Sequence, residues 1–265
     1  MNRMPVVFVG HGNPMYAIEE NEFVSTWHRL GEQLPLPKSI IAISAHWETR
    51  GTAVTSMLHP RTIHDFGGFP EALFQIEYPA PGDPELALKI TETFPDSMIR
   101  TDESWGLDHG TWSVVRHLFP HANVPIVQLS LDFNKTPAEH IQFATKLSAF
   151  RDKGVLIIGS GNLVHNLRHV SWDKPDDEEF AYDWAIEANE KIKQLISNHN
   201  LNELANYKLL GRAVQMAIPT PEHFIPLLYA LALKTESDDI AYFNDKTVMG
   251  SLSMTSLIIG SNQIK

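Results

Sequence analysis

Three short apolar runs along the chain share one pattern: branched aliphatic residues, then small residues, with a histidine at the end of the run. Short runs that are apolar on both faces are typical of strands in parallel sheets covered by helices on each side. The pattern therefore predicts three buried strands that each lead to an imidazole. The runs are residues 5–11 (PVVFVGH), 38–47 (KSIIAISAHW) and 155–165 (VLIIGSGNLVH).

Apolar residues at helical spacing alternate with these runs. They predict helices over residues 22–34, 83–94, 136–154, 178–197 and 220–233, and one more after the glycine-rich loop 104–112. Capping signals support two of these helices, since Pro84 follows the N-cap residue Asp83, and Thr136 forms a capping box with Glu139. Further strands are predicted over residues 52–57 and 126–131, and two strands within residues 241–260 close the sheet.

This order of elements predicts the fold class α/β. We expect a single domain, residues 1–265, with a central, mostly parallel sheet flanked by helices on both faces and a metal site at the carboxyl ends of the strands. The chain has 265 residues, of which 43% are hydrophobic, enough for one large core. No internal repeat or interdomain linker interrupts it.

The amino-acid composition limits the partners and the metal ligands that this protein can have. The formal charge of -11 is spread along the chain without a basic patch, which argues against nucleic acid as a partner. There is no cysteine, so imidazole and oxygen must supply the ligands of any metal. No apolar stretch approaches the ~20 residues of a membrane helix, and the first strand begins too early to leave room for a signal segment. We expect a soluble, cytoplasmic protein without a membrane partner.

Their positions in the predicted elements divide the 13 histidines into candidate metal ligands and structural residues. His11 and His46 end predicted strands beside small residues that let the backbone turn tightly. Neighbouring strands lie about 4.8 Å apart, so imidazoles at adjacent strand ends can reach one ion. With His165 behind the third strand, they predict a metal site. The histidines on helices or in loops among polar neighbours are interpreted as structural: His28, His59, His117, His121, His140, His169 and His199.

His223 is a further candidate ligand. It lies near the start of the predicted helix 220–233, with Thr220 as N-cap, where the helix dipole favours the neutral imidazole that a metal needs. Glu222 is adjacent, but successive helical positions point about 100° apart. We therefore expect one of this pair to bind the ion and the other to support it.

Two other kinds of chemistry lack their motifs. The turns GHGNP and GSGN do not have the spacing of a dinucleotide fingerprint or a P-loop. No G-x-S-x-G nucleophile elbow is present, so serine hydrolase chemistry is disfavoured.

Longer motifs carry a family resemblance over almost the whole chain. They are GHGNPM, SAHW, TIHDFGGFP, YPAPG, DHGTW, GSGNLVHNLR, PTPEHFIPLLY and MGSLSM. In this set the chain resembles the class III extradiol ring-cleavage dioxygenases of the LigB superfamily, specifically the DOPA 4,5-dioxygenase type. The resemblance implies one divalent metal ion per chain, Fe(II) for activity or Zn(II) in its place. It also implies a small catecholic substrate, cleaved with O2 next to its two hydroxyls.

The resemblance also assigns roles to residues. It implies His11, His46 and His223 as metal ligands, and His165 either as a further ligand or as the acid/base beside the metal. His109 in DHGTW is a second candidate for proton transfer or for binding the substrate oxygen.

His64 in TIHDFGGFP is expected to line the substrate pocket, and the alternative is a histidine that only packs its loop. Better-known relatives use two histidines and one carboxylate, so Glu222 stays an alternative to His223. An all-histidine set favours zinc or copper, which leaves the resting metal open.

Two alternative functions fit the same residues. His ligands with an open position would also suit a zinc-dependent hydrolase that uses a metal-bound water. The same scaffold could instead serve a noncatalytic binding protein, which would be marked by loss of the metal ligands. Neither the physiological substrate nor the oligomeric state follows from the sequence.

Overall fold

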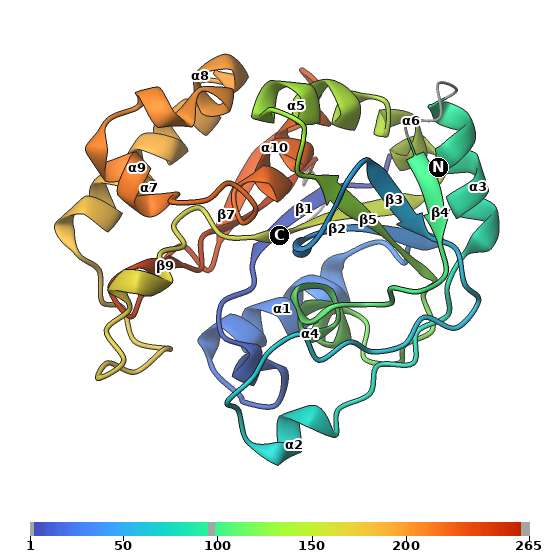
Figure 1. Cartoon of the computed structure of the whole chain (residues 1–265), viewed down its shortest axis with the longest axis horizontal. Coiled ribbons are helices and arrows are strands. Elements are labelled where there is room, and N and C mark those ends of the chain that lie inside the picture. The colour runs from blue at the N-terminus through green and yellow to red at the C-terminus, as the bar shows by residue number, and fades with distance from the viewer. Residues whose placement is uncertain (1–2, 95–98, 261–265) are drawn as a thin grey trace.

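The centre of the molecule is an eight-stranded sheet with the strand order β4-β3-β5-β2-β6-β1-β10-β7 (Figure 1). The structure is a computed structural model and describes residues 3–94 and 99–260. Strands β8 and β9 form a separate small sheet. The strands are β1 Val6–Gly10, β2 Ser39–Thr49, β3 Thr52–Thr55, β4 Ile99–Asp102, β5 Ile126–Asp132, β6 Val155–Gly161, β7 Ile240–Phe243, β8 Thr247–Val248, β9 Leu252–Ser253 and β10 Ser256–Ile259.

The four middle strands, β5, β2, β6 and β1, run parallel to one another. At one side of the sheet β10 is antiparallel to β1, and β7 is antiparallel to β10. At the other side β3 is antiparallel to β5 and parallel to β4. The predicted α/β fold with a mostly parallel sheet is confirmed, and the carboxyl ends of the middle strands meet at one edge.

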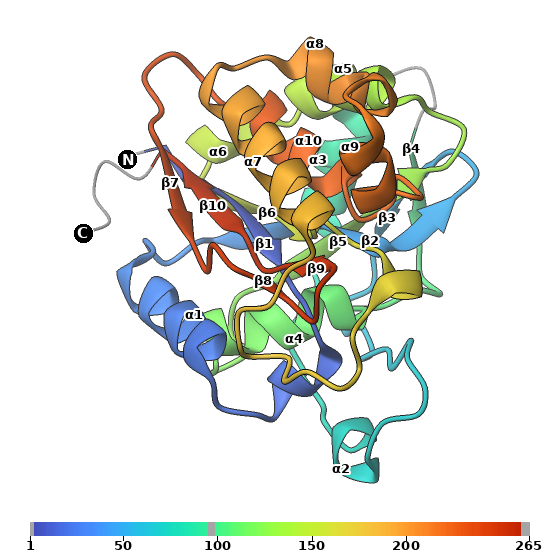
Figure 2. The same cartoon turned by 90° about the vertical axis from the view of Figure 1, so that its left-hand side faces the viewer.

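Two hydrophobic cores cover the two faces of the sheet, because successive side chains of a strand point to opposite faces. In β1, Val6 and Phe8 enter one core, whereas Val7 and Val9 enter the other. Helices α1 and α4 cover one face, and α5, α7 and α10 lie on the other (Figures 1 and 2). The helices are α1 Glu22–Gln33, α2 Glu71–Phe74, α3 Pro84–Thr93, α4 His109–Leu118, α5 Pro137–Thr145, α6 Ser148–Asp152, α7 Asp183–Ser197, α8 Leu201–Ala205, α9 Arg212–Ala217 and α10 Ile225–Ala232.

Several predicted boundaries were wrong. The strand expected to end at His46 continues to Thr49, and the predicted loop 104–112 already becomes helical at His109. The helix predicted over residues 136–154 keeps its capping box but is divided into α5 and α6. The helices predicted from residues 178 and 220 begin only at Asp183 and Ile225. Strand β4 was not predicted.

Backbone groups that pair elsewhere explain the two late helix starts. The N–H of Phe180 donates to the carbonyl oxygen of Thr247 at 3.0 Å, so this segment lies beside β8 instead of joining α7. The carbonyl oxygen of His223 accepts the N–H of Asn162 at 2.8 Å. That bond holds the turn before α10 against the end of β6.

The helices of the described residues, 3–94 and 99–260, are all too short or too polar to cross a bilayer.

Candidate metal centre

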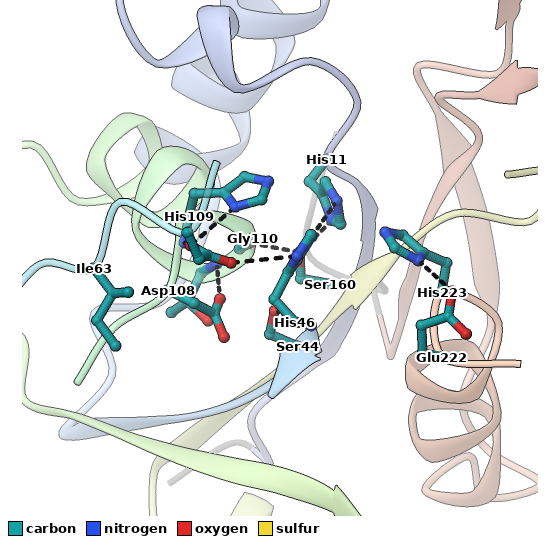
Figure 3. A network of polar contacts seen from close by, with 12 residues as sticks. His11, Ser44, His46, Ile63, Asp108, His109, Gly110, Ser160, Glu222 and His223 are labelled. Carbon is teal, nitrogen blue, oxygen red and sulfur yellow. Dashed lines mark hydrogen bonds and ion pairs between the residues drawn. The ribbon is translucent and has the colours of Figure 1, made fainter. Parts of the chain in front are cut away.

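Histidine side chains from separate elements meet at the carboxyl edge of the sheet (Figure 3). The Nε2 atoms of His11 and His46 lie 3.1 Å apart, and one ring nitrogen of His109 lies within 4.8 Å of a nitrogen on each. The ring centroid of His223 lies 5.3 Å from that of His11 and 5.1 Å from that of His46. His165 stacks on His223 with 3.5 Å between centroids. The fold thus brings together all the residues predicted to serve the metal and proton transfer.

A bulge in β2 turns His46 into this space. Strand β2 pairs with β6 as far as Ser44, and its register with β5 shifts between Ile43 and Glu48. Bulges of this kind re-aim a side chain. Gly110 in the first turn of α4 makes room, since a Cβ there would lie 2.8 Å from the His46 ring and 2.6 Å from Ser44 Oγ. The glycine of DHGTW is therefore required by the close approach of α4 to β2.

Glycines in β6 let the turn that carries His223 approach the sheet. A Cβ on Gly161 would lie 2.1 Å from the carbonyl oxygen of His223, and one on Gly159 would lie 2.5 Å from that of Pro226. The sequence predicted the GSG motif only as a turn. In the structure it is the surface on which a distant segment docks and delivers its imidazole.

A hydroxyl determines the tautomer of His11. Ser160 Oγ lies 2.9 Å from His11 Nδ1, and the same hydroxyl donates its proton to the carbonyl oxygen of Gly110 at 2.5 Å. Because a hydroxyl has only one proton, Ser160 must accept from His11. The proton of the neutral His11 ring therefore lies on Nδ1, and the lone pair of Nε2 is directed toward His46.

Carboxylates occupy the corresponding position on His46 and His223. Asp65 Oδ2 lies 3.3 Å from Nδ1 of His46, and Glu222 Oε1 lies 3.2 Å from Nδ1 of His223. A negatively charged oxygen beside Nδ1 favours the tautomer with its proton there. The Nε2 atom of each ring then carries a free lone pair, and Glu222 contacts the opposite, Nδ1 side of the His223 ring.

These nitrogen atoms fit a divalent cation. Two lone pairs at 3.1 Å repel each other unless a positive charge lies between them. Nitrogen ligands at about 2.1 Å from one ion are themselves about 3.0–3.4 Å apart. The Nε2 atom of His223 is buried and has no hydrogen-bond partner within the described part of the chain. Such an atom is rare in folded proteins, and a metal ligand bond would satisfy it.

Burial keeps the imidazoles neutral. It lowers the pKa of His11 and of His223 well below the ordinary value of 6.5, and the neighbouring histidines lower it further. Burial also lowers the pKa of His46 to about 3, with His109 as the next cause, and that of His165 to about 4. The neutral ring is the form that binds a metal or accepts a proton.

A cavity of about 330 Å³ opens beside the imidazoles. Its other walls are mostly apolar and include Phe69, Trp172, Met249 and Leu252. Among the residues that the structure describes, no lysine or arginine lines it. Apolar walls with a few converging polar groups suit a small aromatic ligand.

His64 is not among the residues that line this cavity, and its role in substrate binding stays a prediction. Its Nε2 donates to the carbonyl oxygen of Ile76 at 2.9 Å, and its ring lies edge-on to Trp112 with 5.6 Å between centroids. The ring is therefore used in packing the loop. Gly67 and Phe69, further along the same loop, reach the cavity instead.

Sequence reasoning missed two of the groups behind the imidazoles, Asp65 and Ser160, whereas one of Glu222 and His223 was expected to support the other. Asp65 and Ser160 both lie in quoted motifs, but neither follows the strand-then-histidine pattern that identified the ligands. The only local signal is that each is a polar residue in a glycine-rich segment beside other site residues.

The carboxyl edge of this α/β sheet carries a group of imidazoles that could hold a metal ion. A family model described as the catalytic LigB subunit of aromatic ring-opening dioxygenase matches residues 6–255. The chain therefore belongs to this family, which confirms the family and the enzyme class expected from its motifs.

Similar proteins support the same conclusion. The 4,5-DOPA dioxygenase extradiol of Escherichia coli (strain K12) is 45% identical over 262 residues, which cover 97% of this chain and 95% of that protein. The protein of the same name from Beta vulgaris is 33% identical and covers 94% of each chain. A crystal structure of an uncharacterized Escherichia coli K12 protein matches with a TM-score of 0.84 and 39% identity, covering 97% of this chain and 100% of that one.

Proposed function

We propose that this enzyme opens the ring of a catechol such as DOPA with O2, next to the two hydroxyls, and that residues 1–265 form one catalytic domain. The observation that carries the proposal is that the rings of His11, His46 and His223, with centroids 5.0–5.3 Å apart, gather beside an apolar cavity. The names of the relatives from Escherichia coli and Beta vulgaris support DOPA as the substrate class.

We further propose that His11, His46 and His223 hold one divalent ion, Fe(II) for activity or Zn(II) in its place. When bound, such an ion supplies a chelation point for both catechol oxygens and a path for electron density to O2. The planes of His165 and His223 are inclined by only 6°. Lone pairs in parallel planes do not meet at one point, so this stacking supports His165 as a proton carrier rather than a fourth ligand.

His109 is the proposed acid/base. Its Nδ1 lies 3.0 Å from Oδ1 of Asp65, which leaves Nε2 as the atom that accepts a phenol proton and later returns it. His165, whose pKa burial lowers to about 4, is neutral at physiological pH and is the competing acceptor. Positioned proton transfer of this kind contributes typically ~10²–10⁴-fold to the rate.

The test is O2 uptake by metal-free protein that is reconstituted anaerobically with Fe(II) and then mixed with DOPA. We expect stoichiometric O2 uptake and a yellow ring-fission product. No uptake by a fully metal-loaded protein that still binds catechol would instead favour the zinc-dependent hydrolase or a binding protein. Location in the cytoplasm stays a prediction from the sequence.

A further inference from the structure

Asp65 lies between His46, a proposed metal ligand, and His109, the proposed acid/base. It belongs to the loop between β3 and α2, and its side chain is only 17% exposed. Oδ1 accepts the backbone N–H of His109 at 2.8 Å and lies 3.0 Å from Nδ1 of the same residue. Oδ2 lies 3.3 Å from Nδ1 of His46. One carboxylate therefore contacts both a proposed metal ligand and the proposed acid/base.

The two side-chain contacts are short contacts between a carboxylate and neutral imidazoles rather than aligned hydrogen bonds. The Nδ1 atom of His109 does not point straight at the carboxylate, although the distance is short. The aligned bond is the one from the backbone of His109, and it locates the start of α4 relative to the loop. A carboxylate only accepts, so its two oxygens favour Nδ1 protons on both rings and leave both Nε2 atoms free.

The same loop also forms part of the cavity wall. Gly67 and Phe69 line the cavity, two and four positions after Asp65. Contacts from Asp65 to α4 and to the bulge of β2 thus hold the wall, the acid/base and one ligand in a single arrangement.

We propose that Asp65 is a positioning residue that sets the tautomer and orientation of His46 and His109 together, so that metal binding and proton transfer depend on one carboxylate. The proposal rests on the proposed function for the roles of the two histidines. It deepens that function by naming the group that couples them.

The variant Asp65→Asn separates the two contacts. The amide oxygen must stay at the Oδ1 position, because the backbone N–H of His109 needs an acceptor there. The amide NH2 group then faces Nδ1 of His46, donor against donor. We expect the His46 ring to move its proton to Nε2, which removes the lone pair that binds the ion.

The experiment measures Zn(II) affinity by competition with a chromophoric chelator, for the wild type and for Asp65→Asn. Zinc is redox-inert, so this readout does not depend on dioxygenase activity. Loss of a group behind a metal-binding histidine typically weakens affinity about 10–100-fold, and we expect a loss in that range. Affinity within twofold of the wild type would overturn the proposal.

The matched control is Asp83→Asn. It makes the same chemical change in the N-cap residue of α3, beside Ser39 at the opposite end of β2, and asparagine caps a helix as well as aspartate does. We expect its zinc affinity to equal that of the wild type. An equal loss in both variants would assign the effect to net charge and would also overturn the proposal.

A measurement on the wild type covers the case in which Asp65→Asn does not fold. Long-range ¹H–¹⁵N spectra of the zinc-loaded protein report the tautomer of each histidine. We expect the Nδ1-protonated form for both His46 and His109, and an Nε2-protonated form of either would refute the proposed role of Asp65. A wild type that binds no zinc at all would instead refute the metal centre.

Discussion

Two pairs of neighbouring histidines in this molecule have similar spacing but differ in what they can bind. Between α1 and α4, Nε2 of His28 lies 3.3 Å from Nδ1 of His117, close to the 3.1 Å between the Nε2 atoms of His11 and His46. The other nitrogen of His117 donates to the carbonyl oxygen of Tyr16 at 2.9 Å. Its Nδ1 must therefore accept the proton of His28, and no lone pair of His117 is left.

The strand-edge pair differs because an oxygen atom lies beside each Nδ1 atom. Ser160 accepts from His11, and Asp65 lies beside Nδ1 of His46, so two lone pairs face each other. The difference shows that proximity of imidazoles does not make a metal site. The groups behind the rings decide whether the facing atoms share a proton or require a cation.

The largest expected effect comes from removing a ligand. We expect His46→Ala to abolish metal retention and turnover, because the facing pair of lone pairs is lost. Metal content after dialysis against a chelator, measured by mass spectrometry, checks this. His28→Gln, in the other pair, should retain the wild-type metal content. Stoichiometric metal in His46→Ala would refute the site.

His109→Ala should keep the metal and lose turnover. Its ring is proposed to carry the proton, and loss of such a group lowers the rate by about 10²–10⁴-fold. Single-turnover kinetics with Fe(II)-loaded protein measure the effect. Rates near those of the wild type would assign proton transfer to His165.

A smaller effect is expected from Gly110→Ala. The added Cβ would lie 2.8 Å from the His46 ring and would push the ring out of line with His11. We expect zinc affinity to fall by about tenfold, at the lower end of the range for disturbed ligand positioning. Gly67→Ala is the control, because nothing lies within 4 Å of its added Cβ. Equal affinities in the two variants would contradict the prediction.

The smallest expected effect is on the pH dependence of stability, and it comes from His117 of the His28–His117 pair. Burial lowers the pKa of His117 from 6.5 to about 4, so the unfolded chain takes up the proton first. Stability from this residue is present above pH 6.5 and is lost as the pH falls toward 4. Between pH 7.5 and 5.5 the loss amounts to about 1 kcal/mol.

The variant His117→Gln tests this pH dependence. Urea unfolding of metal-free protein at both pH values should show a decrease in stability that is smaller by about 1 kcal/mol than in the wild type. Identical decreases in the two proteins would show that His117 does not titrate as its burial implies.

Much of this protein could be predicted from local sequence patterns. Branched apolar runs identified β1, β2 and β6, because a strand covered on both faces needs apolar residues at every position. The same runs located His11 and His46 at the edge where ligands collect. Long ordered motifs identified the family, which the comparisons confirm.

Only the tertiary structure determined which groups lie beside the Nδ1 atoms of these rings and set their tautomers. Ser160 lies 149 positions from His11, and Asp65 reaches His46 from a separate loop, so no local pattern announces either contact. It also showed that the His64 ring donates to the carbonyl oxygen of Ile76 and lies outside the cavity lining. The sequence by itself determined that His11 and His46 arrive at the sheet edge, since strand burial is a local property. Which nitrogen each imidazole presents depends on partners that only the folded chain brings within hydrogen-bond distance.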